Sequence, residues 1–276
     1  MDRYQLGGFE LRRNEHSSDL LLLIDGPTVY KSVISRAFPN LYFSRAFEDR
    51  TGRYGWGVYI KYANQEAEAA IAQFCELLQQ VVLIDDDLTE CSALGFHTEL
   101  SPAGGYQRTE TGRLVYDAKP YDQRGHQGSE QRAEELANRM ARFICAHPTY
   151  RDADLIVAVP PSNPNKPFDL PTYLVETIAA QTGHEVASGA IVKVRQTRPM
   201  KDCRTMQEKL DNIKDAFAVD SDDFEAASVI LIDDIYQSGF SINEVGRIIQ
   251  AAGAKWVLGL TATKTMQDIS EMAMIP

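Results

Sequence analysis

From about residue 129 onward, apolar residues occur in two alternating patterns, short continuous runs and stripes at helical spacing. The runs predict buried β-strands at 154–159, 191–194, 215–219, 229–232 and 256–262. The stripes predict helices at 130–146, at 170–182 and after 240. Strands that alternate with helices predict an α/β fold, in which a parallel, twisted sheet carries helices on both faces.

The first third of the chain has a less regular pattern. It predicts strands at 20–24, 55–62 and 81–84 and a helix at 65–80. The glycine-rich segment 95–121, with alternating residues such as Leu114, Tyr116 and Ala118, predicts a β-hairpin or meander. We therefore expect an N-terminal α+β extension over 1–108 and the α/β domain over 109–276, with the boundary between 105 and 125.

The run at 229–232 ends in two adjacent carboxylates, Asp233 and Asp234, and a loop over 235–239 is expected to follow. Ser241 and Asn243 are expected to open the next helix. A helix amino end presents unpaired N–H groups and a positive dipole, and Gly239 would let the backbone approach an anion closely. A phosphate held there, beside carboxylates that accept hydrogen bonds from sugar hydroxyls, describes a phosphorylated ribose. The alternative is that the acidic pair binds a metal ion, as in response regulators and nucleotide hydrolases.

Two other segments of the chain are rich in charged residues. Asp85, Asp86 and Asp87 also follow an apolar run, but no glycine comes before Gly95, so we interpret them as a strand-end turn. The segment 195–210 is basic and lacks an apolar period, and it either closes over an anionic ligand or forms a solvated loop. Aromatic residues of the first third could stack on a base or belong to a strand core: Tyr54, Trp56 and Tyr59.

Composition limits the classes of partner. The formal net charge is −11, which excludes duplex DNA or an anionic membrane as the partner of the whole surface. No apolar run approaches the ~20 residues of a membrane-spanning helix, and no signal-peptide pattern opens the chain. The four cysteines are scattered without a CxxC pair, so reduced thiols and a cytoplasmic location are expected.

The stretch VILIDDIYQSGFS, over 229–241, resembles the PRPP-binding signature of the type I phosphoribosyltransferases. Two further segments, DLIVAVPP at 154–161 and the basic segment at 196–217, are similar to the ComF-like branch of that superfamily. The order of the three segments agrees, and the resemblance covers about 109–265. The sequence departs from the family pattern at Gln237, which stands for a Thr, and in the turn after Pro161, where Lys166 is the one cation.

The resemblance implies a role for each candidate residue. Asp233 and Asp234 would bind the ribose 2′- and 3′-hydroxyls, with Mg²⁺ held indirectly through the ribose or water. The 5′-phosphate would be held by Tyr236, Gln237, Ser238, Gly239, Phe240 and Ser241. The diphosphate would be held by Pro160, Pro161, Ser162 and Asn163. A mobile basic loop would close over the site with Arg195, Arg198, Lys201 and Lys209. Lys166 and Arg204 would join the acidic pair in catalysis, as cations that neutralise the leaving diphosphate.

Three functions are consistent with these residues. The first is a phosphoribosyltransferase-like enzyme that uses PRPP or a ribose 5-phosphate nucleotide with Mg²⁺, in phosphoribosyl transfer or N-glycosidic bond chemistry. The second is a non-catalytic PRPP or nucleotide sensor. The third is an effector of a bacterial defence operon that acts on nucleotides or nucleic acid, by fold analogy alone. We also expect a protein partner or a homo-oligomer, and nucleic acid only as part of an operon complex. We expect no membrane partner.

Overall fold

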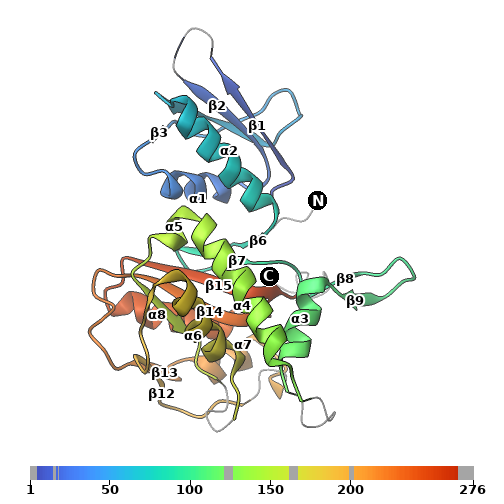
Figure 1. The fold of residues 1–276 in the computed structure, drawn as a ribbon, viewed down its shortest axis with the longest axis vertical. Helices are drawn as coiled ribbons and strands as arrows, with labels where there is room; N and C mark the ends of the chain where they lie inside the picture. The colour runs from blue at the N-terminus through green and yellow to red at the C-terminus, as the bar shows by residue number, and fades with distance from the viewer. Residues whose placement is uncertain are drawn as a thin grey trace. The chain divides into compact units, whose positions relative to one another are not determined.

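The computed structural model describes residues 5–14, 17, 19–120, 127–161, 167–198 and 202–266. The chain forms two compact units (Figure 1). The first unit comprises Met1–Asp85 and Phe143–Asp152, and the second comprises Asp86–Arg142 and Ala153–Pro276. No helix of the described ranges has the length and apolar character needed to cross a bilayer.

In its described residues, the first unit contains an antiparallel sheet and three helices. The strands of this sheet are β1 (Gly8–Arg13), β2 (Leu20–Asp25), β3 (Tyr42–Phe43), β4 (Phe47–Glu48) and β5 (Trp56–Lys61), and the later strand β6 (Val82–Ile84) is not part of it. The helices of this unit are α1 (Val29–Ala37), α2 (Gln65–Gln79) and α5 (Pro148–Arg151). The antiparallel sheet has the order β1-β2-β5-β3, and β4 also pairs with β5.

Local sequence explains these elements. The continuous apolar run makes β2 almost wholly buried, and β5 alternates buried and exposed positions in its second half. Asn64 caps α2, since its side chain accepts a hydrogen bond from the Ala67 N–H at 2.8 Å. Ile71, Phe74 and Leu78 then form the buried stripe of α2. The predicted strands and helix of this region are therefore confirmed.

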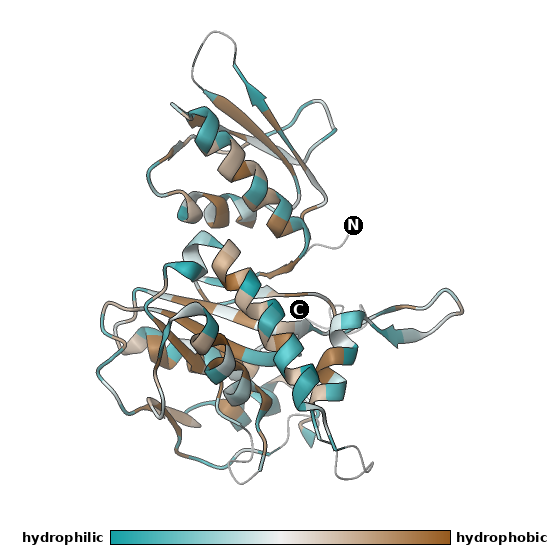
Figure 2. Cartoon of the chain, viewed as in Figure 1, coloured by the Kyte–Doolittle hydropathy of each residue, from teal (hydrophilic) through white to brown (hydrophobic). Residues whose placement is uncertain are grey.

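The second unit contains a parallel sheet. Its strands run in the order β11 (Glu185–Val186), β10 (Leu155–Ala158), β14 (Ser228–Tyr236), β15 (Trp256–Lys264) and β7 (Glu90–Ala93), and every neighbouring pair among them is parallel. The helices are α3 (Glu110–Ala118), α4 (Glu130–Ala146), α6 (Leu170–Thr182), α7 (Met206–Ile213) and α8 (Phe240–Ala251), and the last turn of α4 belongs to the first unit. Figure 2 shows apolar residues along β14 and β15, whose Val229–Ile232 and Val257–Leu258 segments are fully buried. The predicted α/β fold with a parallel sheet and helices is confirmed.

The division into units differs from the expected boundary at 108/109. The chain enters the second unit at Asp86, because β7 pairs with β15 through Cys91 and Gly259. It returns to the first unit over Phe143–Asp152, where the His147 and Phe74 rings meet edge to face at 4.7 Å. An apolar pattern predicts that a segment is buried but not which other segment it packs against.

The expected hairpin or meander over 95–121 is correct only in its first part. β8 (Thr98–Leu100) and β9 (Tyr106–Arg108) form an antiparallel hairpin, but the residues after it form α3. Thr109 caps this helix by accepting a hydrogen bond from the Gly112 N–H at 3.0 Å. Leu114, Val115 and Ala118 are buried together, which is helical spacing and not strand alternation.

A second difference concerns the strands around the basic segment. β12 (Ile191–Lys193) and β13 (Phe217–Val219) pair antiparallel with each other as a separate two-stranded ribbon. The alternation of runs and stripes predicted both as strands of the parallel sheet. Each strand is three residues long and only partly buried, so neither has the apolar length of a central sheet strand.

Candidate functional site

The acidic pair lies at the carboxyl end of the central strand, β14. The strand is longer than expected, because Ile235 and Tyr236 still pair with Thr263 and Lys264 of β15. On the other side, the Val159 N–H donates to the Ile232 carbonyl at 2.9 Å, so β10 ends beside Asp233. The carboxyl ends of neighbouring parallel strands are where such sheets bind ligands.

A tight turn connects the pair to α8. The helix begins at Phe240 with Gly239 as its N-cap, and not at Ser241 or Asn243 as expected. Gly239 has φ of +74°, a left-handed conformation that glycine adopts without strain. No side chain caps this amino end, so the N–H groups of the first turn are oriented to bind an anion.

The side chain of Tyr236 supports the turn from the interior. It is 7% exposed, and the Asn243 amide donates to its hydroxyl at 3.4 Å. A Cβ atom placed on Gly239 would overlap that hydroxyl and lie 2.8 Å from the Asn243 amide nitrogen. Tyr236 therefore positions the turn, whereas Gln237 is exposed and Ser238 and Ser241 are partly exposed.

The pair is asymmetric in its electrostatics. Asp234 forms an ion pair with Lys119, at the end of α3, and the Asp234 N–H donates to Asp233 Oδ1 at 2.8 Å. Burial, and next the charge of Asp234, raise the pKa of Asp233 well above the usual aspartate range. The Asp234 N–H and Lys119 oppose this rise only in part. Asp233 would therefore be stabilised as a carboxylate by any ligand that donates hydrogen bonds or brings positive charge.

Sequence reasoning missed two residues beside the pair, Lys119 and His97. The His97 ring lies 3.1 Å from Thr263 Oγ1, and the charges of Lys119 and Asp234 both act on it. Burial, followed by Arg108 and Lys119, lowers the pKa of His97. Both residues belong to the segment interpreted as a meander. Recognising a helix there would have put Lys119 at a helix carboxyl end, a common place for a cation.

The predicted diphosphate turn is described in part. Pro160 and Pro161 follow β10 and are partly buried beside the carboxyl end of β14. Ser162, Asn163 and Lys166 lie outside the described residues.

The described residues of the basic segment make specific hydrogen bonds and form a helix. The Arg195 guanidinium donates to the carbonyls of Asp211, Asn212 and Lys214, at the carboxyl end of α7. Arg198 is held through its backbone, since Asn212 bonds both its N–H and its carbonyl at 2.9 Å. The side chains of Arg198 and Arg204 are exposed, Lys209 is partly exposed, and Lys201 lies outside the described residues.

The helix in this segment was missed because caps, and not an apolar stripe, define it. Thr205 accepts from the Glu208 N–H, and Glu208 accepts from the Arg204 N–H at 2.8 Å. Met206 and Leu210 are exposed.

Asp86 is close enough to Tyr236 for each side chain to affect the pKa of the other. It accepts a hydrogen bond from the Leu88 N–H at 3.1 Å, as a strand-end turn requires. Burial raises the pKa of Asp86 to about 6, with a smaller contribution from Asp87, whereas Leu88, Cys91 and Tyr236 lower it.

Asp86→Asn is expected to stabilise the protein above neutral pH by about 1–3 kcal/mol. A raised pKa means that the folded chain binds this proton more tightly than the unfolded chain. The contribution of Asp86 to the unfolding free energy is therefore most favourable below the unfolded pKa of about 3.8 and is lost as the pH rises through about 6. Urea denaturation at about pH 8 and about pH 4 should show a gain for the variant only at the higher pH. The exposed Asp87→Asn serves as control, and equal stability of Asp86→Asn and the natural protein at pH 8 would contradict the prediction.

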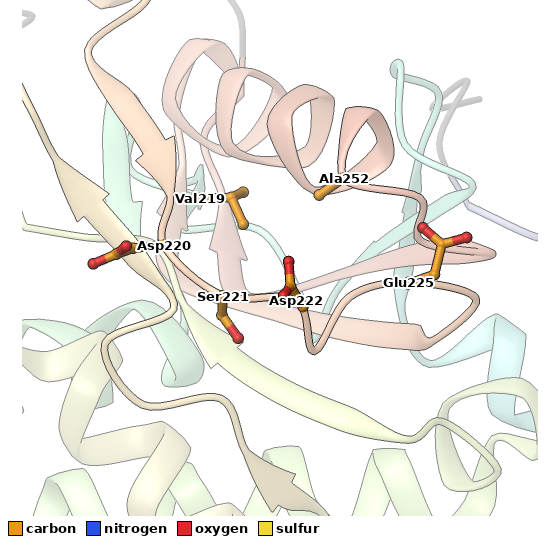
Figure 3. A pocket seen from close by; sticks show the side chains of 6 residues that line it. All are labelled: Val219, Asp220, Ser221, Asp222, Glu225 and Ala252. Carbon is orange, nitrogen blue, oxygen red and sulfur yellow. The ribbon is translucent and has the colours of Figure 1, made fainter.

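A pocket elsewhere in the second unit does not belong to this site. It is lined by acidic and small side chains from the β13–β14 connection and the end of α8 (Figure 3): Val219, Asp220, Ser221, Asp222, Glu225 and Ala252. These residues precede β14 and follow α8, so they lie at the amino end of the strand, opposite the acidic pair.

Among the described residues, no group of three or more His, Cys, Asp or Glu side chains is placed to hold a metal ion. Mg²⁺ is a hard cation that keeps several waters and is commonly bound by one or two carboxylates together with the phosphates of a substrate. The donor set at Asp233 and Asp234 therefore fits a Mg²⁺ ion shared with a ligand and not one enclosed by the protein alone.

The comparisons with known proteins give only distant similarities. No protein-family model matches the chain, and no curated protein matches it. A glutamine PRPP amidotransferase from B. subtilis, solved with ADP and GMP, is 13% identical with a TM-score of 0.37, over 88% of this chain and 46% of that one. A structure described as the allosteric regulatory enzyme of purine biosynthesis is 12% identical with a TM-score of 0.38, over 93% of this chain and 50% of that one.

A hypoxanthine phosphoribosyltransferase from Staphylococcus aureus is 11% identical with a TM-score of 0.31, over 51% of this chain and 76% of that one. The chain spans about half the length of the first two proteins. At these identities and TM-scores the similarities carry no argument about activity, which has to come from the site itself.

Proposed function

We propose that the chain binds PRPP or a ribose 5-phosphate nucleotide together with Mg²⁺ and catalyses phosphoribosyl transfer. The observation that carries the proposal is the continuous unit formed by Asp233, Asp234 and the uncapped start of α8 at Gly239. The N–H groups of the first helical turn suit a 5′-phosphate, and the carboxylates near the end of β14, just before the turn, suit the sugar hydroxyls.

The turn, the acidic pair and Lys119 have different roles in this reaction. The turn and the acidic pair bind and orient the ribose, so that its C1 faces the nucleophile as diphosphate departs. Lys119 neutralises one charge of the pair, which lowers the repulsion between the carboxylates and an anionic ligand. Bound Mg²⁺ would supply positive charge to the phosphate oxygens.

A second candidate is a sensor that binds the same ligand without turnover. The contacts of Arg195 favour it, because its guanidinium binds helix carbonyls and is therefore engaged within its own segment. Release of diphosphate requires cations near the leaving group, and among the described arginines of this segment Arg198 and Arg204 have exposed side chains for that role. Membership of the ComF-like branch and a role in a defence operon stay predictions.

Calorimetry with PRPP and Mg²⁺ tests the shared part of both candidates. We expect saturable binding, with an affinity that rises with pH as Asp233 loses its proton, since the ribose hydroxyls donate to the carboxylate. Binding that is absent for PRPP and for nucleoside monophosphates alike would exclude both candidates. Where binding is found, a diphosphate-release assay with a set of bases distinguishes the enzyme from the sensor.

A further inference from the structure

The outer face of the sheet in the first unit carries side chains that the proposed function does not use. In β5, Trp56, Val58 and Ile60 are buried, whereas Tyr59 is 43% exposed. Trp56 is a core residue whose Nε1 donates to the Gly26 carbonyl at 2.9 Å. Of the three aromatic residues considered for base stacking, Tyr59 is the one that this alternation places outward.

Tyr59 belongs to a group of three exposed aromatic residues on adjacent strands, Tyr42, Phe47 and Tyr59, which we call the aromatic platform. Tyr42 is 63% exposed and Phe47 is 36% exposed. The rings of Phe47 and Tyr59 are stacked, with centroids 5.3 Å apart and planes at 29°. Phe47 pairs with Gly57, where an added Cβ would lie 2.8 Å from the Phe47 ring, so the glycine makes room for this ring.

Charged residues surround the platform. Tyr42 pairs with Lys61, and Arg12 faces the same side as Tyr59, because both pair with Leu21. Glu10 lies on this face too and bonds the Arg12 guanidinium at 2.7 Å. Arg13 and Glu48 lie on the opposite face, since they pair with the buried residues Leu20 and Trp56. Over the rest of β1, β2 and 42–61, five cations stand against three acids: Arg12, Arg45, Arg50, Arg53 and Lys61 against Glu10, Asp25 and Asp49. This local excess is opposite in sign to the net charge of −11.

We propose that the aromatic platform binds single-stranded RNA. Exposed aromatic rings on a sheet face stack on unpaired bases, and nearby cations attract the phosphates. Two of the three rings are tyrosines, whose hydroxyls can bond the 2′-hydroxyl or a base edge. A buried protein interface would instead be expected to lack charged residues at its centre. Here, Lys61 lies directly opposite Tyr42.

Fluorescence anisotropy of a labelled oligouridine of about 12 nucleotides, added to the full chain, tests the proposal. Tyr59→Ala and Phe47→Ala should each weaken binding roughly 5- to 100-fold, since one stacked base is lost. Tyr106→Ala, which removes an exposed tyrosine from the second unit, should leave the affinity unchanged. Lys61→Gln should reduce the slope of log affinity against log salt by about 0.7, since one phosphate contact is lost.

Absence of binding at about 50 mM salt would overturn the proposal, as would equal weakening by Tyr106→Ala and Tyr59→Ala. Loss of self-association in Tyr59→Ala, measured by sedimentation without any RNA binding, would assign the face to a protein partner and overturn it as well. Calorimetry of the same variants with PRPP keeps the two proposals separate, because the platform variants should bind PRPP as the natural protein does.

Discussion

Replacing both Asp233 and Asp234 with asparagine is expected to weaken binding of PRPP about 100-fold or more. Each carboxylate would accept a hydrogen bond from a ribose hydroxyl, and a bond to a charged group contributes about 1.5–3 kcal/mol. Asparagine keeps the size of the side chain but removes its charge, and one of its two terminal atoms becomes a donor. The loss should therefore fall on the ligand and not on the packing of β14.

Stability and affinity should separate in this variant. The raised pKa of Asp233 shows that its charged form is unfavourable in the folded protein, so its removal should not lower the unfolding free energy above neutral pH. Asp220→Asn with Asp222→Asn is a matched control, because these two acids of the same unit line the pocket at the other end of β14. If calorimetry finds the same PRPP affinity in the Asp233/Asp234 variant and the natural protein, the ribose assignment is wrong.

Gly239→Ala is expected to lower the unfolding free energy by about 2–4 kcal/mol and to abolish most phosphate binding. About 1–2 kcal/mol of this comes from the left-handed backbone, which alanine adopts unfavourably. The remainder comes from overlap of the new methyl group with the Tyr236 hydroxyl and the Asn243 amide. Moving the turn to relieve the overlap would also move the N–H groups that start α8.

Gly183→Ala provides the matched control for this change. Gly183 has φ of +82° at the end of α6, and an added Cβ would meet nothing within 4 Å. Gly183→Ala should therefore lower the unfolding free energy only by the cost of the left-handed backbone, about 1–2 kcal/mol, and it should not change ligand binding. Adding Tyr236→Phe to Gly239→Ala removes the closest overlapping atom, the hydroxyl, but leaves the ring carbon 2.6 Å from the new methyl group, so it should restore only part of the stability. Urea denaturation measures the unfolding free energy of Gly183→Ala, Gly239→Ala and the double variant. A double variant no more stable than Gly239→Ala alone would contradict the packing argument.

Much of the fold could be predicted from the sequence, because the central strands of the parallel sheet are continuous apolar runs. The segment around β14 is an apolar run long enough to be buried whole, and its neighbours β10 and β15 have the same character. The helix predicted at 170–182 ends where expected, with Gly183 in the left-handed conformation common after a helix end. The apolar pattern did not predict α7, because that helix is defined by its caps and not by an apolar stripe.

The sequence by itself determined the succession of β10, α6, β14, α8 and β15 in the second unit, and the order of acidic pair, glycine and helix after its central strand. These features depend on residues close in the chain, whose spacing fixes which face they share. Only the tertiary structure decided that Lys119 and His97 lie beside Asp234, that Tyr236 supports the turn from within, and that Tyr59 faces solvent whereas Trp56 does not. Those outcomes depend on which segments pair across long stretches of chain, as in the register of β7 and β15, and no local pattern carries that information.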